Sequence, residues 1–288
     1  MPRLHDLIAL LRPTHWTKNV FVLMPVPFAL AAGAQISPAR LLLGLVAFCL
    51  AASAVYALND ALDAPRDRLH PRKRRRPVAA GRVAPSLAYA LAAGLAGSAL
   101  LGVGLGGDAA PVAMLALDLA LHVVYSFGGK HVPMVDVFLL ASGFVLRVLF
   151  GCALIGVTPS NWLLLCSSSL ALLLGLAKRR ADVVEGVSSA HRPVLSGYDH
   201  RFLDQAMTLA AATTVLSYAL YCLEAEIMIP GRELAGLPFV VFGVLDYLRL
   251  ANVDGAGAEP VETILSSPAL LLSGVGWAAA TFWSIQLP

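Results

Sequence analysis

The chain has 288 residues, of which 58% are hydrophobic and only 14% are charged, and its formal net charge is +3. Its mean hydropathy is +0.74, whereas an average soluble domain has about 25% charged residues with which to cover its core. These values exclude a disordered tail, a disulfide scaffold and a conventional nucleic-acid-binding protein, and they predict an integral membrane protein.

The predicted elements begin with a short amphipathic helix over residues 1–12, which we expect to lie in the membrane interface. Nine apolar segments follow that are long enough to span a bilayer. They cover residues 19–36, 40–58, 84–106, 109–127, 133–156, 159–177, 203–224, 236–251 and 266–287. The eighth is the weakest candidate, because Asp246 and Arg249 interrupt its second half. The sequence therefore predicts an all-α membrane protein with about nine transmembrane helices in a single domain over residues 1–288.

The Lys and Arg residues indicate how these spans are oriented. With nine spans and the N-terminus inside, every Lys and Arg except Arg40, Arg147 and Arg232 falls in a cytoplasmic segment or at its border. By the positive-inside rule, this distribution places the N-terminus in the cytoplasm. Polar residues concentrate on the same side, in residues 59–83 and 178–202, which we expect to form two cytoplasmic cap loops. A reaction on a polar substrate is therefore predicted at the cytoplasmic face.

An acidic motif follows the second span, and it contains Asn59, Asp60, Asp63 and Asp67. On a helix the residues at i, i+4 and i+8 share one face, and Asp60 lies beside them. Carboxylates this close repel one another unless a cation lies between them, and their hard oxygen atoms suit Mg²⁺ bridging to a diphosphate. We therefore predict that all four residues are metal ligands. Pro65 lies inside the motif, where a proline tends to kink a helix, so two outcomes stay open: Asp67 shares the face, or the kink moves it away.

A basic run over residues 70–77 follows the acidic motif directly. Lys and Arg side chains at this place can neutralise a metal-bound diphosphate and stabilise the charge that develops as it departs. The alternative interpretation is that the run only anchors the topology. We predict that Lys73 and Arg76 act together with Asp60 and Asp63 as the catalytic residues.

The pattern NDxxDxxxDRxHPxKxxRPxAxG, read from Asn59 to Gly81, resembles the first aspartate-rich motif of the UbiA superfamily of intramembrane prenyltransferases. The resemblance implies nine helices around a lipid-accessible cavity with a cytoplasmic polar cap. Other segments resemble one branch of the superfamily, whose members transfer phosphoribose to a polyprenyl phosphate. They are Arg12-Pro13-x-x-Trp16-x-Lys18-Asn19, Tyr125-Ser126-x-x-x-Lys130 leading to Asp136, Gly143-Phe144-x-x-Arg147, Lys178-Arg179-Arg180-x-Asp182 and Tyr218-x-Leu220-Tyr221.

For this branch, the resemblance implies a Mg²⁺-dependent membrane enzyme that moves 5-phosphoribose from phosphoribosyl diphosphate to decaprenyl phosphate and releases diphosphate. The product would supply arabinose units for a bacterial cell envelope. The implied location is the bacterial plasma membrane, with the active site facing the cytoplasm, and homo-oligomer formation stays open. The implied substrate contacts are Lys18, Asn59, Arg68, Lys73, Arg76, Tyr125, Lys130, Asp136, Lys178, Arg179 and Asp182.

The two transferase functions differ in the donor substrate, which is either phosphoribosyl diphosphate or a prenyl diphosphate. A typical aromatic prenyltransferase of the superfamily carries a second carboxylate pair after span six, where this chain has cations at residues 178–180. Extra positive charge suits the 5-phosphate of phosphoribosyl diphosphate, although these cations could also be anchors. A UbiA-type prenyltransferase that moves a prenyl group to an aromatic or other small acceptor is the alternative function.

A small membrane transporter is a third interpretation. It would need charged residues along a path through the bilayer, whereas most polar groups here gather at one face. Some charges do lie within apolar segments, and each needs a partner because an unpaired charge in the bilayer is costly. They are Asp118, Asp136, Arg147 and Asp246. Asp118 and His122 lie four residues apart and are predicted to be able to satisfy each other.

Overall fold

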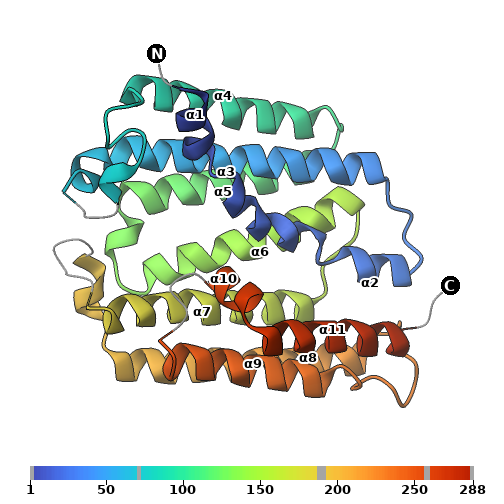
Figure 1. Ribbon diagram of the computed structural model, residues 1–288. Coiled ribbons are helices and arrows are strands. Elements are labelled where there is room, and N and C mark those ends of the chain that lie inside the picture. Colours follow the sequence, from blue (N-terminus) through green and yellow to red (C-terminus); the bar gives the residue numbers. More distant parts are fainter. Residues whose placement is uncertain (1–2, 70–72, 187–192, 256–259, 286–288) are drawn as a thin grey trace. The chain divides into compact units, whose positions relative to one another are not determined.

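The structure is a computed structural model that describes residues 3–69, 73–186, 193–255 and 260–285. In this part of the chain it is helical, apart from one isolated antiparallel bridge between Met228 and Ile285. Figure 1 shows the elements in chain order. They are α1 (Leu4–Leu11), η1 (Pro13–Leu23), α2 (Val26–Ala31), α3 (Pro38–Asp67), η2 (Lys73–Arg75), α4 (Pro85–Gly104), α5 (Ala109–Phe127), η3 (Gly129–His131), α6 (Val135–Ile155), α7 (Asn161–Val184), η4 (Pro193–Gly197), α8 (His200–Glu224), α9 (Leu237–Asn252), α10 (Pro260–Ser266) and α11 (Pro268–Ser284).

Six helices in the described residues, α3 to α8, are long and apolar enough to cross a membrane. They confirm an all-α, multi-pass membrane protein, but the predicted count of nine spans is not confirmed. The predicted span 19–36 is divided between the 3-10 helix η1 and the short α2, because Pro25 interrupts it just before α2. α9 and α11 have 16 and 17 residues, fewer than the roughly 20 that a perpendicular span needs.

The two segments predicted as cap loops both start as helix. Residues 59–67 are the last turns of α3, and residues 178–184 are the last turns of α7. The polar residues at the start of each segment therefore have the fixed spacing of a helix. The short helix predicted over residues 1–12 is present as α1, from Leu4 to Leu11, and its place in the membrane interface stays a prediction.

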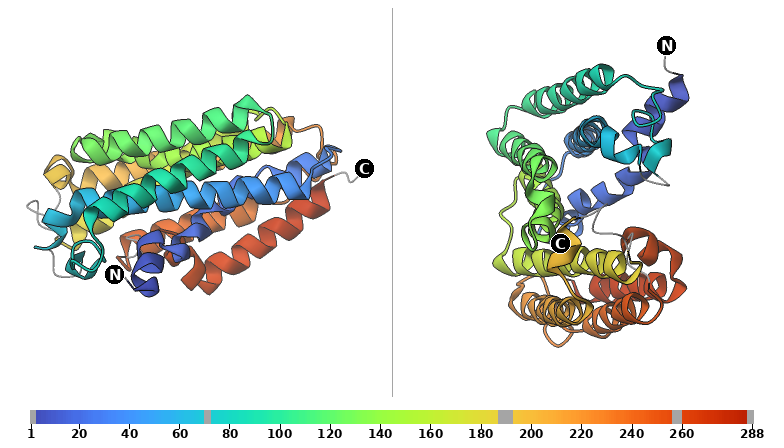
Figure 2. Two further views of the ribbon diagram at one scale, coloured as in Figure 1. Left: turned by 90° about the horizontal axis from the view of Figure 1, so that it is seen from above. Right: turned by 90° about the vertical axis from the view of Figure 1, so that its left-hand side faces the viewer.

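The chain separates into two compact units, and the first comprises residues 1–24, 36–130 and 146–157. Within it α3 packs along α4, as the views in Figures 1 and 2 agree. One apolar cluster includes Phe48, Leu115 and Phe150, which are fully buried. α3 and α6 approach closely at Gly44, where a Cβ atom would lie 2.3 Å from Cδ1 of Leu154. This packing fixes α3, the helix that carries the acidic motif.

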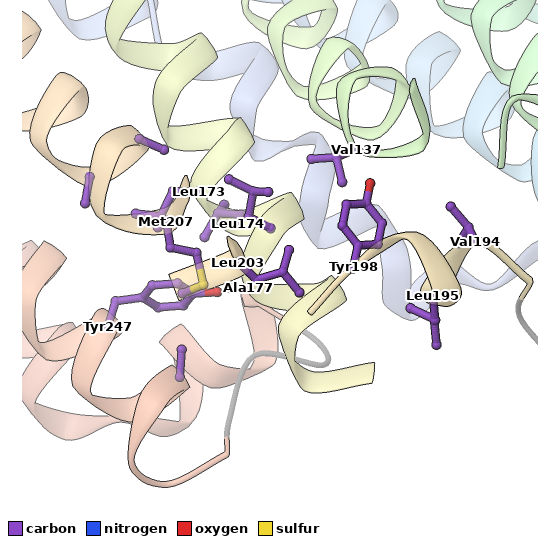
Figure 3. Packing of buried hydrophobic residues seen from close by; sticks show 14 of the residues in the cluster. Val137, Leu173, Leu174, Ala177, Val194, Leu195, Tyr198, Leu203, Met207 and Tyr247 are labelled. Carbon is purple, nitrogen blue, oxygen red and sulfur yellow. The ribbon is translucent and has the colours of Figure 1, made fainter. Parts of the chain in front are cut away.

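The second unit comprises residues 25–35, 131–145 and 158–288. In it α7 packs along α8, and α9 packs against α11. Its core contains Leu173, Leu203 and Met207 (Figure 3). Tyr198, which follows η4, belongs to the same cluster and lies beneath Val137 of α6. The chain that leads from η4 into α8 is thereby packed onto the start of α6.

Candidate active site

The acidic motif lies on one uninterrupted helix. α3 starts behind Ser37, whose side chain accepts a hydrogen bond from the Arg40 backbone N–H, and it continues through Pro65 to Asp67. The helix continues beyond the proline, because the Arg68 backbone N–H still donates to the Ala64 carbonyl at 3.2 Å. Pro65 therefore does not end the helix before Asp67.

Each carboxylate of the motif is paired with a basic side chain from another segment. Arg76 lies between two of them, with Nη1 2.6 Å from Asp67 Oδ2 and Nε 3.6 Å from Asp60 Oδ1. Nζ of Lys130, from η3, lies 2.6 Å from Oδ1 of Asp63. The acidic face of α3 is thus covered by cations that the sequence pattern predicted as phosphate contacts.

Arg12 is a third cation at this face, and the sequence analysis gave it no role. Its Nη2 lies 3.1 Å from Asp60 Oδ1, and its guanidinium lies 5.0 Å from the centroid of the Tyr56 ring. Arg12 follows α1 in a left-handed conformation with φ 50°, which a non-glycine residue rarely adopts. Burial lowers the pKa of Arg12 from its ordinary value, and the neighbouring Arg76 lowers it further. The only signal in the sequence was the Arg12-Pro13-x-x-Trp16 pattern.

An ion pair binds the segment that carries Arg76 to α1. Nε of Arg82 lies 2.6 Å from Oδ1 of Asp6, and Nη2 of Arg82 donates to the Arg75 carbonyl at 2.8 Å. Asp6 is buried, and the hydrogen bond from Arg82 lowers its pKa. α1 therefore brings Arg12 to the motif and also anchors the chain on either side of Arg76.

The donor atoms of this face suit a divalent cation that is shared with a phosphate group. Asp60 Oδ2 is buried and has no hydrogen-bond partner among the residues that the structure describes, which is unfavourable unless a ligand satisfies it. Within the described ranges, no three His, Cys, Asp or Glu side chains converge into a ready-made metal cage. Mg²⁺ rarely uses such a cage, since it is usually bound by one or two carboxylates, water and substrate phosphates. The residues present therefore fit Mg²⁺ bound together with a diphosphate.

Asn59 differs from its acidic neighbours because its partner is neutral. The Ser126 hydroxyl, from α5, lies 2.5 Å from Asn59 Oδ1. Ser126 was part of a family-like pattern but was not predicted as a site residue.

The remaining predicted contacts of the first unit lie on neighbouring elements. Lys18 lies on η1, Lys73 begins η2 and Tyr125 lies on α5, and all three are half-buried. Arg68 follows α3 and is exposed. Residues 70–72 of the basic run lie outside the described residues.

The predicted residues of the second unit form a buried ion-pair network. The guanidinium of Arg179 binds Asp136 through Nε, and its Nη1 lies 3.0 Å from Asp182 Oδ2. The Tyr198 hydroxyl donates to the other oxygen of Asp136 at 2.6 Å. Burial and the bond to Asp136 raise the pKa of Tyr198, so its phenol stays a hydrogen-bond donor. Asp136 and Arg179 both have 0% of their surface exposed.

Two of the three cations at the end of α7, Lys178, Arg179 and Arg180, bind protein carboxylates. Arg179 is held between two carboxylates, and Arg180 binds Asp204 at 2.5 Å and the Ala251 carbonyl at 2.7 Å. Lys178 is half-buried. Of the three, Arg179 and Arg180 thus have structural partners in the second unit, and Arg179 orients Asp182.

The charges within the apolar segments find different kinds of partner. Arg147 donates from Nε to the Asn19 side-chain oxygen at 3.0 Å and lies over the Phe48 ring, so an amide and an aromatic ring are among its partners. Asp246 pairs with Arg249 at 2.8 Å. Asp118 and His122 are 3.8 Å apart, and neither oxygen of Asp118 has a hydrogen-bond partner in the described part of the chain. The two residues thus lie within ion-pair distance, as predicted, but they do not form a hydrogen bond.

Comparison with known proteins identifies the class to which this fold and site belong. Residues 19–252 match the UbiA prenyltransferase family, and the chain belongs to this family. Among its relatives, the decaprenyl-phosphate phosphoribosyltransferase of Corynebacterium glutamicum is 34% identical, covering 98% of this chain and 87% of the relative. The Mycobacterium tuberculosis protein of the same name is also 34% identical, covering 93% of this chain and 90% of its own length.

Solved structures of the family share the fold. The UbiA homologue from Archaeoglobus fulgidus bound to GPP and Mg²⁺ has a TM-score of 0.74 at 21% identity, covering 96% of each chain. The structure of a digeranylgeranylglyceryl phosphate synthase has a TM-score of 0.71 at 15% identity, covering 96% of this chain and 98% of that one. These structures share the fold, and the family match and the named relatives make the chain a UbiA-type membrane transferase.

Proposed function

We propose that the protein transfers 5-phosphoribose from phosphoribosyl diphosphate to a polyprenyl phosphate and releases diphosphate. The observation that carries this proposal is the acidic face of α3, in which Asp60, Asp63 and Asp67 are each bound by a cation. Relatives 34% identical over nearly the whole chain are named decaprenyl-phosphate phosphoribosyltransferases, which supports this donor and decaprenyl phosphate as the acceptor.

The carboxylates of α3 are the proposed ligands of Mg²⁺. Asp60 offers a buried oxygen that has no hydrogen-bond partner in the described part of the chain, and Asp63 and Asp67 lie one and two turns away on the same helix. When bound, Mg²⁺ would neutralise charge on the diphosphate and polarise its bond to the sugar. The sequence-based assignment adds Asn59 to these ligands.

The cations of the first unit are proposed to bind the diphosphate. Arg76, Lys130 and Arg12 neutralise the carboxylates in the absence of substrate, and Arg76 and Lys130 are placed to transfer part of their hydrogen bonding to phosphate oxygens. Such fixed cations stabilise charge as it develops on a leaving diphosphate. Lys73, Lys18, Arg68 and Tyr125 are further proposed contacts on the neighbouring elements.

The acceptor needs little chemical activation. A polyprenyl phosphate is already an anion at pH 7, so its oxygen can attack the anomeric carbon without a general base. The bond from that carbon to the diphosphate breaks as the new carbon–oxygen bond forms. Catalysis by this chain would consist mainly of positioning the two substrates and neutralising the leaving group.

The proposed setting is the bacterial plasma membrane, with the N-terminus and the site facing the cytoplasm, where phosphoribosyl diphosphate is soluble. The distribution of Lys and Arg supports this orientation. We also propose, from the family resemblance of the sequence, that the product supplies arabinose units for a cell-envelope polysaccharide.

In the second unit, Lys178 remains the proposed contact to the 5-phosphate of the donor. Arg179 and Asp136 are proposed to act through Asp182, because the Arg179 guanidinium is fully buried between the two carboxylates. This replaces the expectation that Arg179 meets the soluble donor directly.

The experiment that tests the function is transfer of labelled phosphoribose by the purified protein in detergent. We expect label to move from phosphoribosyl diphosphate to decaprenyl phosphate in the presence of Mg²⁺. Parallel reactions contain a labelled prenyl diphosphate and an aromatic acceptor. Transfer of the prenyl group, with none of phosphoribose, would reject the proposed function in favour of a prenyltransferase.

A further inference from the structure

Ser126 contacts the first polar residue of the acidic face from a neighbouring helix. It lies in the last turn of α5, and its side chain is buried, at 7% exposed. Its Oγ lies 2.5 Å from Asn59 Oδ1 and 2.7 Å from the carbonyl oxygen of His122. The direction of these two hydrogen bonds decides which end of the Asn59 amide faces the site.

The single hydrogen of the Ser126 hydroxyl can go to only one of the two oxygens. The His122 carbonyl is inside α5 (Ala109–Phe127), so it already accepts the helical backbone N–H from four residues further on. That carbonyl has a second lone pair and can also accept the hydroxyl, but the Asn59 oxygen makes the shorter of the two contacts. Ser126 therefore donates to Asn59.

The length of the contact also fixes the orientation of the amide. Oxygen–oxygen hydrogen bonds are about 2.5–3.0 Å long, whereas those between nitrogen and oxygen are about 2.7–3.2 Å. The contact of 2.5 Å thus suits the amide oxygen and is too short for the amide nitrogen. Nδ2, with its two hydrogens, faces the other way, and among the described residues it has no hydrogen-bond acceptor.

We infer that Ser126 is a positioning residue, which holds the Asn59 amide so that Nδ2 donates to a phosphate oxygen of the bound diphosphate. This inference rests on the proposed function and makes Asn59 a hydrogen-bond donor instead of a metal ligand. An amide N–H₂ group complements an anion but cannot coordinate Mg²⁺, which takes oxygen ligands. Lys130 follows Ser126 by four residues and binds Asp63. The end of α5 thus orients a neutral donor and supplies a cation at the same acidic face.

The substitution Asn59→Asp distinguishes a hydrogen-bond donor to phosphate from a metal ligand at residue 59. Aspartate keeps the size of the side chain and offers an oxygen in place of the N–H₂ group. It would preserve or improve a metal ligand, but it would repel a phosphate oxygen. We expect binding of inorganic diphosphate at saturating Mg²⁺ to weaken by about tenfold or more, the scale of a hydrogen bond to a charged group. Unchanged or tighter binding of diphosphate by Asn59→Asp would overturn the inference.

Ser126 is tested by removing and then restoring the hydroxyl. We expect Ser126→Ala to weaken diphosphate binding by about threefold or more and to raise the KM for phosphoribosyl diphosphate, with the KM for polyprenyl phosphate unchanged. Ser126→Thr should keep wild-type values. The matched control is Thr213→Ala, because Thr213 lies on α8, in the second unit, and its hydroxyl donates to the Leu209 carbonyl of the same helix, at 2.9 Å. It should leave all values unchanged.

Equal changes in both KM values for Ser126→Ala, or no rescue by Ser126→Thr, would show that Ser126 is only structural and would overturn the inference. Thermal unfolding of each variant checks that the fold is intact. Binding of inorganic diphosphate does not depend on which group the donor transfers. A wild-type protein that fails to transfer phosphoribose would therefore reject the proposed function, while the comparison of diphosphate binding would still decide the role of Ser126.

Discussion

Arg76 links two carboxylates of the acidic face, so its removal tests both the stability and the chemistry of the site. The side chains of Asp60 and Asp67 are only 2% and 6% exposed, and Arg76 itself is 26% exposed. In Arg76→Gln, Asp60 would still be paired with Arg12, whereas Asp67 would lose its ion pair. The substitution therefore leaves one nearly buried carboxylate without its cation.

The expected magnitude follows from these burials. Removing one partner of a fully buried ion pair costs about 3–5 kcal/mol, and an exposed pair contributes about 0–1 kcal/mol. Since Arg76 is partly exposed and Arg12 remains, we expect the free energy of unfolding to fall by about 1–2 kcal/mol, between these limits. Turnover should fall by about 10²–10³, which is the usual effect of losing a group that stabilises transition-state charge.

The assay measures turnover at saturating substrates and thermal unfolding in detergent, with Arg74→Gln as the matched control. Arg74 lies two residues away in η2 and is exposed, so its replacement changes the net charge equally without changing an ion pair of the acidic face. We expect Arg74→Gln to behave like the wild type. Normal turnover in Arg76→Gln, or an equal loss in Arg74→Gln, would refute the role that we derive from the pairing geometry.

Three further outcomes are expected. Asp63→Asn, which removes one negative charge and weakens a hard-cation ligand, should lower turnover by about 10²–10³ and shift its Mg²⁺ dependence; normal values would reject Asp63 as a metal ligand. Lys178→Gln should raise the KM for phosphoribosyl diphosphate and leave the unfolding temperature unchanged. Arg179→Gln should also lower the unfolding temperature, because it leaves Asp136 and Asp182 without their shared cation. Equal unfolding temperatures for the two variants would contradict the structural role of Arg179. Sealed inside-out vesicles should use external phosphoribosyl diphosphate without permeabilisation, and activity confined to right-side-out vesicles would reverse the orientation.

Local spacing made the acidic face predictable. Asn59, Asp63 and Asp67 follow the helical repeat, and a helix places such residues on one face whatever the rest of the fold does. The effect of Pro65 was not predictable in the same way. A proline removes one backbone hydrogen bond, but here it lies in the last turn, and Arg76 holds Asp67 from outside the helix.

The partners of these carboxylates depend on tertiary structure, which a single sequence does not specify. Arg12 lies 48 residues before Asp60, and Ser126 and Lys130 each lie 67 residues after their partners. Their basic or polar character was visible, but the helix packing that brings them to α3 was not. The sequence also did not indicate which side chains of the second unit are buried. Arg179 was expected to contact substrate, and it is completely buried.

The charges of the first site also predict how Mg²⁺ binds. Three carboxylates, Asp60, Asp63 and Asp67, face three cations, Arg12, Arg76 and Lys130, so the formal charge of the group is −3 + 3 = 0. A lone Mg²⁺ would have to displace ion pairs at a neutral site, whereas a diphosphate brings more negative charge than one Mg²⁺ neutralises. Mg²⁺ and diphosphate should therefore each increase the other's affinity by the same factor, typically about 5–150-fold. The measurement is Mg²⁺ affinity by titration calorimetry with and without inorganic diphosphate, on the purified protein in detergent, corrected for the Mg²⁺ that free diphosphate binds. Equal Mg²⁺ affinity under both conditions would show that the carboxylates form an independent metal site and that their ion pairs do not oppose metal binding.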